Sequence, residues 1–220
     1  MGKIRVYRED QADRVVQEAA AVLAGGGLVA CPTETFYALA ADVSNPAALT
    51  RVLALKGRPA TKPLLVLVAA PAMLPQVVAS VPEAARRLMA QFWPGPLTLI
   101  LPARPGLPLP LTGGTGTVGV RQPGLALTRE VAARLHRPIT GTSANRAGEA
   151  PLTTAQQVEE VFGPAVDLIL EAGPCPGGLP STIVDLTVAP PRLRRAGVLP
   201  PAALRPYLPD LVLAADVPGG

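Results

Sequence analysis

The sequence feature that most constrains the fold is an uninterrupted apolar run, Leu-Leu-Val-Leu-Val-Ala, at residues 64–69. Its length suits a β-strand, and the absence of alternating polar residues is typical of a strand that is buried on both faces. Such strands occur in parallel or mixed sheets that are covered by helices. The run therefore predicts an α/β fold.

Other apolar runs of strand length alternate with amphipathic segments of helical period. Strands are expected at residues 3–7, 28–31, 97–101, 118–121, 138–142, 166–170 and 183–186. Helices are expected after the N-caps Asp10, Asn45 and Thr154, and at residues 82–92, 125–135 and 202–207. Residues 102–111 are rich in proline and are expected to form a surface loop.

The length of 220 residues fits one domain, which we place at residues 1–207, followed by a tail at 208–220. Prolines interrupt every apolar run well before the roughly 18 residues that a membrane span needs. The first ten residues contain no apolar signal region. We therefore expect a soluble, cytoplasmic protein without membrane contact.

Cysteine and histidine are too scarce for several kinds of chemistry. Cys31 and Cys175 are the only cysteines and lie far apart in sequence, so free buried thiols are expected. His136 is the single histidine, and it is expected at a solvated helix terminus. A histidine-based metal site and a Ser-His-Asp triad are therefore disfavoured.

Cations are concentrated in one segment. Lys56, Arg58 and Lys62 lie within seven positions, and the chain has only one other lysine. Charges at the C-terminal end of a helix are also favoured by the helix dipole, so Lys56 and Arg58 could be purely structural. The alternative is a cationic loop, stiffened by prolines, that binds an anion.

Hydroxyl and amide side chains gather where predicted strands end, which is where open α/β sheets bind ligands. The glycine-rich segment 112–117 could bind an anion through its backbone N–H groups or could simply be a flexible hairpin loop. Arg121 ends the next strand, and its guanidinium suits a carboxylate. These polar groups include Thr35, Thr117, Ser143, Asn145 and Ser181.

The formal net charge of +4 is compatible with an acidic partner, but aromatic residues are only 3% of the chain. Single-strand binding surfaces normally stack bases on several aromatic side chains, so this class is disfavoured. A basic groove that binds along the phosphates of a nucleic acid remains an alternative.

Six short motifs stand out along the chain. They are Thr-Glu-Thr-Phe-Tyr at 33–37, Lys-Gly-Arg at 56–58 with Lys-Pro-Leu at 62–64, Pro-Gly-Pro-Leu-Thr at 94–98, Val-Arg-Gln-Pro at 120–123, Ser-Ala-Asn at 143–145 and Ser-Thr-Ile-Val-Asp at 181–185. In this order they resemble the YrdC/TsaC family, and the resemblance runs from about residue 15 to residue 197. The resemblance implies an α/β fold: a single YrdC-like domain with a twisted mixed sheet, flanking helices and a concave basic face. It also implies an L-threonylcarbamoyladenylate synthase of the short form, which uses L-threonine, bicarbonate and ATP with Mg²⁺.

The resemblance also implies roles for single residues. Thr35, Arg121 and Ser181 are expected to bind L-threonine. Lys56 and Arg58 are the expected catalytic residues. The expected ATP contacts are Arg58, Lys62, Thr117, Ser143, Asn145 and Arg195. The product would pass to tRNA threonylcarbamoyl-transferase proteins for modification of tRNA, and contact with tRNA or double-stranded RNA is also implied.

The sequence departs from the family pattern in places. Ala38 and Ala40 stand where glycine is common, and alanine would be strained if the backbone there had positive φ. Leu67 stands where some members have histidine. The sequence leaves open which of Arg194 and Arg195 meets the nucleotide. An RNA-binding protein without synthase activity and a carbamoyl-adenylate enzyme with another acceptor therefore remain alternatives.

Overall fold

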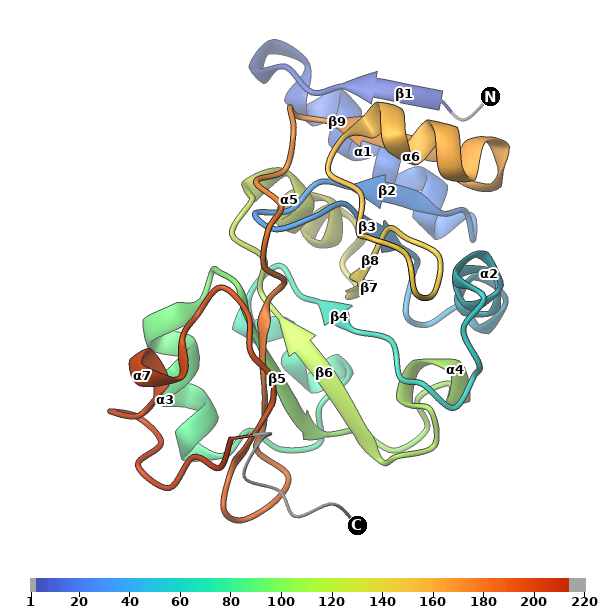
Figure 1. Ribbon diagram of the computed structural model, residues 1–220. Helices are drawn as coiled ribbons and strands as arrows, with labels where there is room; N and C mark the ends of the chain where they lie inside the picture. Colours follow the sequence, from blue (N-terminus) through green and yellow to red (C-terminus); the bar gives the residue numbers. More distant parts are fainter. Residues whose placement is uncertain (1–2, 214–220) are drawn as a thin grey trace.

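The computed structural model describes residues 3–213, whose strands form two mixed sheets (Figure 1). The five-stranded sheet has the order β1 (Lys3–Val6), β9 (Leu168–Glu171), β2 (Val29–Cys31), β3 (Ala38–Ala40) and β8 (Thr142–Ser143). The six-stranded sheet has the order β11 (Arg192–Arg195), β10 (Thr182–Asp185), β5 (Leu97–Pro102), β6 (Thr117–Arg121), β4 (Val66–Leu67) and β7 (Ile139–Thr140). The mixed α/β class is confirmed, with two sheets in place of the expected single one.

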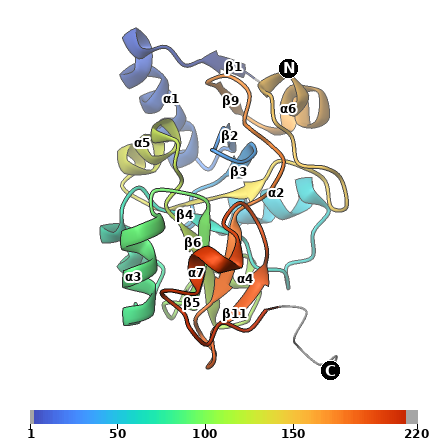
Figure 2. The same ribbon diagram turned by 60° about the vertical axis from the view of Figure 1, so that its left-hand side comes forward.

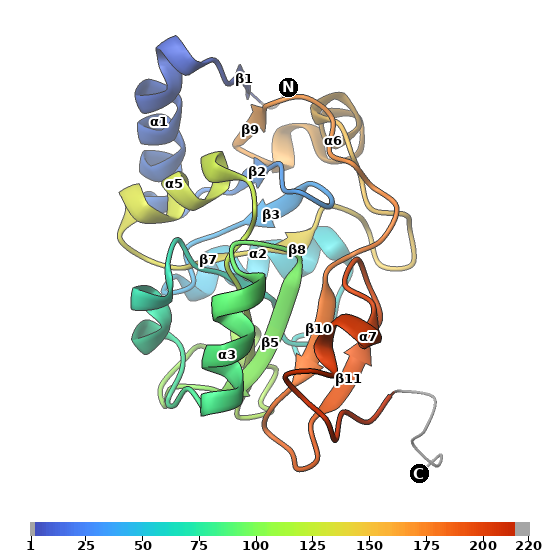
Figure 3. The same ribbon diagram turned by 90° about the vertical axis from the view of Figure 1, so that its left-hand side faces the viewer.

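Helices cover both faces of the five-stranded sheet (Figure 3). Helices α1 (Ala12–Ala24) and α5 (Ala126–Leu135) lie on one side, and α6 (Ala155–Phe162) lies on the other. Side chains of a strand alternate between its two faces. Accordingly, Val29 and Cys31 of β2 pack with α1 and α5, whereas Ala30 packs in the cluster that includes α6. Burial on both faces explains why these strands read as continuous apolar runs.

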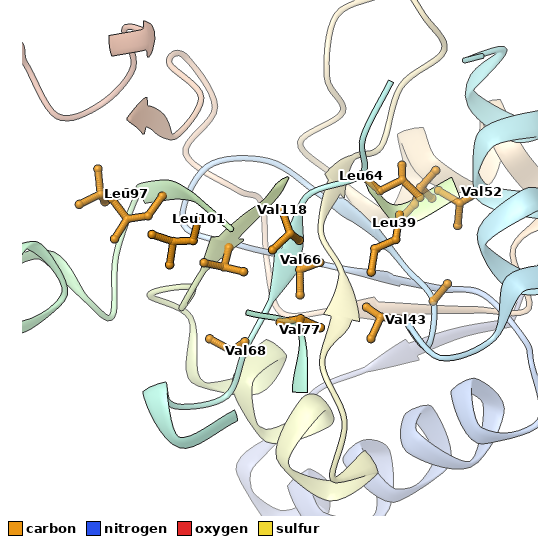
Figure 4. Close-up of a cluster of buried hydrophobic side chains, with 14 of the residues drawn as sticks. Leu39, Val43, Val52, Leu64, Val66, Val68, Val77, Leu97, Leu101 and Val118 are labelled. Atoms are coloured by element: carbon orange, nitrogen blue, oxygen red, sulfur yellow. The ribbon is translucent and has the colours of Figure 1, made fainter. Parts of the chain in front are cut away.

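The six-stranded sheet is joined to the first by one continuous core (Figure 4). Leu39 of β3 shares a buried cluster with Val66 of β4 and Val118 of β6. Helix α3 (Glu83–Phe92) and the short α7 (Pro201–Leu204) cover this sheet (Figure 2). Helix α2 (Pro46–Lys56) and the short α4 (Leu109–Thr112) lie beside each other, and α4 also contacts β6 (Figure 1).

Two of the predicted N-caps are confirmed and one is wrong. Asn45 accepts a hydrogen bond from the Ala48 N–H, and Thr154 forms a capping box with Gln157. Asp10 instead lies in a 3₁₀ turn (Glu9–Gln11), and α1 begins after it without a side-chain cap.

The predicted strand at 138–142 is two strands that belong to different sheets. Gly141 separates β7 from β8, and its N–H donates to the Leu65 carbonyl at 2.7 Å. A Cβ atom on Gly141 would lie 2.3 Å from Cγ of Leu67, so a side chain has no room there. This glycine lets the chain pass from one sheet to the other where the sheets meet.

Other segments also differ from expectation. Only Val66–Leu67 of the 64–69 run is paired as a strand, although Leu64 and Val68 are buried as predicted. The expected surface loop at 102–111 runs into α4, where Leu111 is fully buried. Of the expected tail at 208–220, Leu208, Leu211 and Leu213 pack on the core and the Leu193 N–H donates to the Val212 carbonyl, whereas residues 214–220 lie outside the described part of the chain.

Candidate functional site

A cavity of about 460 Å³ opens where the ends of strands from both sheets converge. Strands β6, β8, β10 and β11 each contribute to its wall, together with the turns after β2 and α2. Apolar side chains such as Leu64 and Ile100 line part of it. The predicted site residues that line the cavity are Thr35, Arg58, Thr117, Arg121, Ser143, Ser181 and Arg195.

The other predicted site residues lie outside this lining. Lys56 is buried behind the cavity wall, and its ammonium contacts Ser143 and Asn145. Asn145 is half-buried beside Ser143, and Lys62 is exposed on the loop that follows α2. Arginine, not lysine, therefore supplies the positive charge of the cavity wall.

Thr33 fixes the turn that presents Thr35. Its hydroxyl donates to the Phe36 carbonyl at 2.7 Å and accepts from the N–H groups of Thr35 and Phe36. The Thr35 hydroxyl lies 3.0 Å from the Thr33 hydroxyl, whose only proton is already committed to Phe36. Because Thr33 does not donate to it, the Thr35 hydroxyl keeps one lone pair for a donor in the cavity besides the one that faces Nη1 of Arg121.

Arg121 reaches the cavity from the end of β6 and is almost completely buried. Its Nε donates to the Gly95 carbonyl at 3.1 Å, and its Nη1 lies 3.5 Å from the Thr35 hydroxyl. Its Nη2 lies 2.7 Å from Oε1 of Glu34, a close ion pair without the alignment of a hydrogen bond. The guanidinium thus keeps N–H groups that could donate hydrogen bonds to a ligand carboxylate.

The Ser181 side chain lies between Thr98 of β5 and Arg195. Its hydroxyl lies 2.9 Å from that of Thr98 and 3.1 Å from Nη2 of Arg195. Arg195 also donates from Nε and Nη2 to the Ser181 carbonyl at 3.1 and 2.8 Å. By contrast, both Nε and Nη2 of Arg194 bind the Asp185 carboxylate. Of these two neighbouring residues, Arg195 therefore lines the cavity and Arg194 does not.

The glycine-rich segment packs against the cationic loop. Gly113 has φ of 61°, and a Cβ atom there would lie 2.5 Å from the Thr61 carbonyl oxygen. Thr115 and Thr117 share a hydroxyl contact of 2.9 Å, and Thr117 lines the cavity. Glycine is needed here for the left-handed backbone and for the close approach of the two loops.

Burial lowers the pKa of several cationic groups at the site. Desolvation lowers the pKa of Arg58, and desolvation together with the charge of Arg121 lowers that of Arg195. Desolvation and the charge of Arg58 lower the pKa of Lys56 to about 8. Desolvated cations close to one another favour the binding of an anion, which restores charge balance.

The two alanines that stand where the family commonly has glycine cause no backbone strain. Ala38 and Ala40 lie in β3, and among residues 3–213 the only non-glycine residue with positive φ is His136. Leu67 is buried against Gly141 and does not line the cavity. Cys31 and Cys175 are free and buried, as predicted.

Sequence reasoning did not identify every cavity residue. Tyr37 is completely buried, and its hydroxyl has no hydrogen-bond partner within the described part of the chain. Thr98 belongs to one of the family motifs, which was the available signal for it. Gly141, Thr142 and Gly178 carry no comparable signal, because only the meeting of the two sheets brings them to the cavity.

Residues 3–213 contain no cluster of three or more histidine, cysteine, aspartate or glutamate side chains that could hold a metal ion. Nor does any helix in the same range have the length and apolar character needed to cross a membrane.

The fold and the cavity define an α/β protein with an arginine-lined cavity at the junction of two sheets. The sequence profile of the Sua5/YciO/YrdC family, described as "Telomere recombination", matches residues 21–197. The chain belongs to this family.

Named relatives agree with this assignment. The chain is 40% identical to threonylcarbamoyl-AMP synthase of Pyrococcus abyssi over 185 residues, which cover 84% of this chain and 54% of that protein. It is 37% identical to a putative threonylcarbamoyl-AMP synthase of Mycobacterium tuberculosis over 192 residues, which cover 86% of each. The chain thus spans about half the length of the Pyrococcus relative and most of the mycobacterial one.

Solved structures share the fold. The crystal structure of P. abyssi Sua5 complexed with L-threonine matches with a TM-score of 0.90 and 35% identity, covering 97% of this chain and 62% of that one. The E. coli YciO structure matches with a TM-score of 0.81 at 24% identity, which supports the fold alone.

Proposed function

We propose that the protein is an L-threonylcarbamoyladenylate synthase, a nucleotidyltransferase that converts L-threonine, bicarbonate and ATP into threonylcarbamoyl-AMP and pyrophosphate. The observation that carries this proposal is the placement of Arg58, Arg121 and Arg195 around one cavity together with Thr35 and Ser181. Relatives that bear the name of this enzyme, and a relative crystallised with L-threonine, support it.

In this proposal Thr35, Arg121 and Ser181 bind L-threonine. The free donors of Arg121 receive the carboxylate, and the Thr35 hydroxyl accepts from the α-ammonium group or from Arg121. The half-apolar lining of the cavity suits a small amino acid with a methyl group.

Arg58, Thr117, Ser143 and Arg195 line the nucleotide side of the cavity in this proposal. Lys62 is exposed on the loop beside the glycine-rich segment, and in this proposal its ammonium contacts the phosphates of ATP. Arginine side chains can neutralise several phosphate oxygens at once through their planar set of donors.

The chemistry proceeds in two steps. The neutral amine of threonine first attacks the carbon of bicarbonate, and a C–O bond breaks as the hydroxyl group leaves as water with a proton from the nitrogen, which gives N-carboxy-threonine. An oxygen of that new carboxylate then attacks the α-phosphorus of ATP, and the bond to the β-phosphate oxygen breaks, which releases pyrophosphate. The cavity contributes by orienting the reactants and by neutralising the charge that develops on the phosphates.

Mg²⁺ is proposed to enter with the phosphates of ATP. The cavity wall offers hydroxyl groups such as those of Thr117 and Ser143, and Mg²⁺ commonly keeps several waters and binds mainly to substrate phosphates. The protein would work in the cytoplasm and pass its product to tRNA threonylcarbamoyl-transferase proteins.

The identity of the product tests this proposal. The protein is incubated with ATP, Mg²⁺, bicarbonate and L-threonine, and threonylcarbamoyl-AMP is sought by mass spectrometry, with L-serine in place of L-threonine as a parallel sample. Product with L-threonine supports the synthase. Product only with another acceptor would favour a different carbamoyl-adenylate enzyme. RNA binding that weakens steeply with salt, without any adenylate product, would favour an RNA-binding protein.

A further inference from the structure

Lys56 is a buried cation that does not reach the cavity. It is the last residue of α2 and is only 4% exposed. Its ammonium donates to the Ser143 carbonyl, to the Asn145 carbonyl at 3.0 Å and to Oδ1 of Asn145 at 3.0 Å. An ammonium group has three N–H donors, so these contacts use all of them. Lys56 therefore has no donor left for a phosphate.

The segment that follows β8 is folded around this ammonium. Oδ1 of Asn145 also accepts from the Ser143 hydroxyl at 2.6 Å. The amide group of Asn145 donates to the carbonyls of Arg146 and Glu149, and the Ala147 N–H donates to the Lys56 carbonyl at 2.8 Å. Side chain and backbone of Lys56 thus both hold the segment, and we call this arrangement the Lys56 clamp.

The clamp joins two sides of the cavity. Ser143, at the start of the clamped segment, lines the cavity, and so does Arg58, two residues after Lys56. Gly57 lies between Lys56 and Arg58 in the left-handed conformation that ends α2. A single buried ammonium therefore fixes the end of α2 relative to the end of β8.

We infer that Lys56 is a positioning residue that fixes Ser143 relative to Arg58 for the binding of a nucleotide triphosphate, and that it does not touch the substrate. This inference rests on the proposed function. It changes the role that the sequence motif implies for Lys56 from catalysis to positioning.

Direct binding tests the inference. Lys56→Met removes the ammonium and keeps the length of the side chain. Lys3→Met is the matched control, because Lys3 forms an exposed ion pair with Glu18 at 2.7 Å and does not line the cavity. The affinities of each protein for α,β-methylene-ATP and for L-threonine are measured by calorimetry, and its melting temperature is recorded.

We expect Lys56→Met to weaken the binding of α,β-methylene-ATP at least tenfold and that of L-threonine less than threefold, while Lys3→Met changes neither by more than twofold. Nucleotide binding within threefold of the unchanged protein would overturn the inference. An equal loss for both ligands would also overturn it, because it would indicate a general structural role.

A second variant covers the case in which Lys56→Met does not fold. Lys56→Arg keeps the charge, but a planar guanidinium cannot direct its donors at the same acceptors as a compact ammonium. The same selective loss of nucleotide binding is expected, and its absence counts against the inference. If the unchanged protein itself does not bind the nucleotide, the proposed function fails instead.

Discussion

Nη2 of Arg121 lies 2.7 Å from Oε1 of Glu34, and the two side chains are only 5% and 24% exposed. Arg121 thus has a counter-ion inside the protein, on the side away from its contact with Thr35. Glu34 is not part of the cavity lining, so the pair leaves the cavity edge of the guanidinium open for a ligand. This ion pair balances the charge of a buried arginine inside the protein.

Replacing Glu34 by glutamine should lower the free energy of unfolding by about 3 kcal/mol, because it leaves the charge of Arg121 buried without a counter-ion. Urea denaturation measures the change. Asp13→Asn is the control: Asp13 pairs with Arg134 at the surface and is 76% exposed, so the loss there should be below about 1 kcal/mol. Equal losses in the two variants would contradict this account of the pair.

Replacing Arg121 by lysine should raise the KM for L-threonine by about tenfold or more and raise the KM for ATP much less. A lysine cannot keep the contact with the Gly95 carbonyl and also present further donors beside Thr35. Steady-state kinetics with each substrate varied in turn separates the two constants. An equal rise in both KM values would contradict a specific role of Arg121 in binding L-threonine.

The low pKa of Lys56, about 8, predicts that nucleotide affinity declines as pH rises through that value. The neutral amine has one donor fewer than the ammonium, so it cannot serve all three acceptors of the clamp. The effect on stability has the opposite sign. Because the pKa of this lysine is lower in the folded protein than its ordinary value of 10.5, the unfolded chain binds more protons between the two values, and this group makes stability rise with pH there.

Calorimetric titrations with α,β-methylene-ATP at several pH values between 7 and 9.5 would measure the decline. The same titrations with Lys56→Met provide the control, because this variant cannot lose the proton. A decline of equal size in both proteins would assign the effect to another group.

Gly141→Ala should destabilise the protein by about 1–3 kcal/mol, because its Cβ atom would lie 2.3 Å from Cγ of Leu67 in a closely packed core. Gly25→Ala offers a matched comparison, since a Cβ atom there would meet its nearest neighbours at an ordinary 3.5 Å. Thermal denaturation of both variants measures the difference. A Gly141→Ala protein as stable as Gly25→Ala would show that Leu67 moves aside without cost.

The buried strands and the longer helices could be predicted because each has a local pattern. Leu64, Val66, Leu67 and Val68 of the 64–69 run are buried as expected, and Asn45 with Pro46 marks the start of α2. Strands β3 and β8 are too short for a periodic pattern, and their pairing with each other depends on contacts distant in sequence. The division into two sheets depends on the packing of Gly141 against Leu67, which no local pattern encodes.

Seven of the predicted site residues line one cavity, whereas the geometry of each could not be predicted from the sequence. Arg195 faces Ser181 and Arg194 faces Asp185, because neighbouring residues of a strand point to opposite faces. No strand was predicted at β11, so the two arginines could not be distinguished. The motif grouped Lys56 with Arg58, and only the structure shows that its ammonium is fully used by Ser143 and Asn145.

The release of pyrophosphate from ATP tests the central claim most directly. It would be measured with bicarbonate and Mg²⁺, with and without L-threonine, for the unchanged protein, Arg58→Ala and Arg121→Ala. We predict release that depends on L-threonine in the unchanged protein and is lost in both variants. Release that does not respond to L-threonine, in a protein that binds ATP, would contradict the synthase.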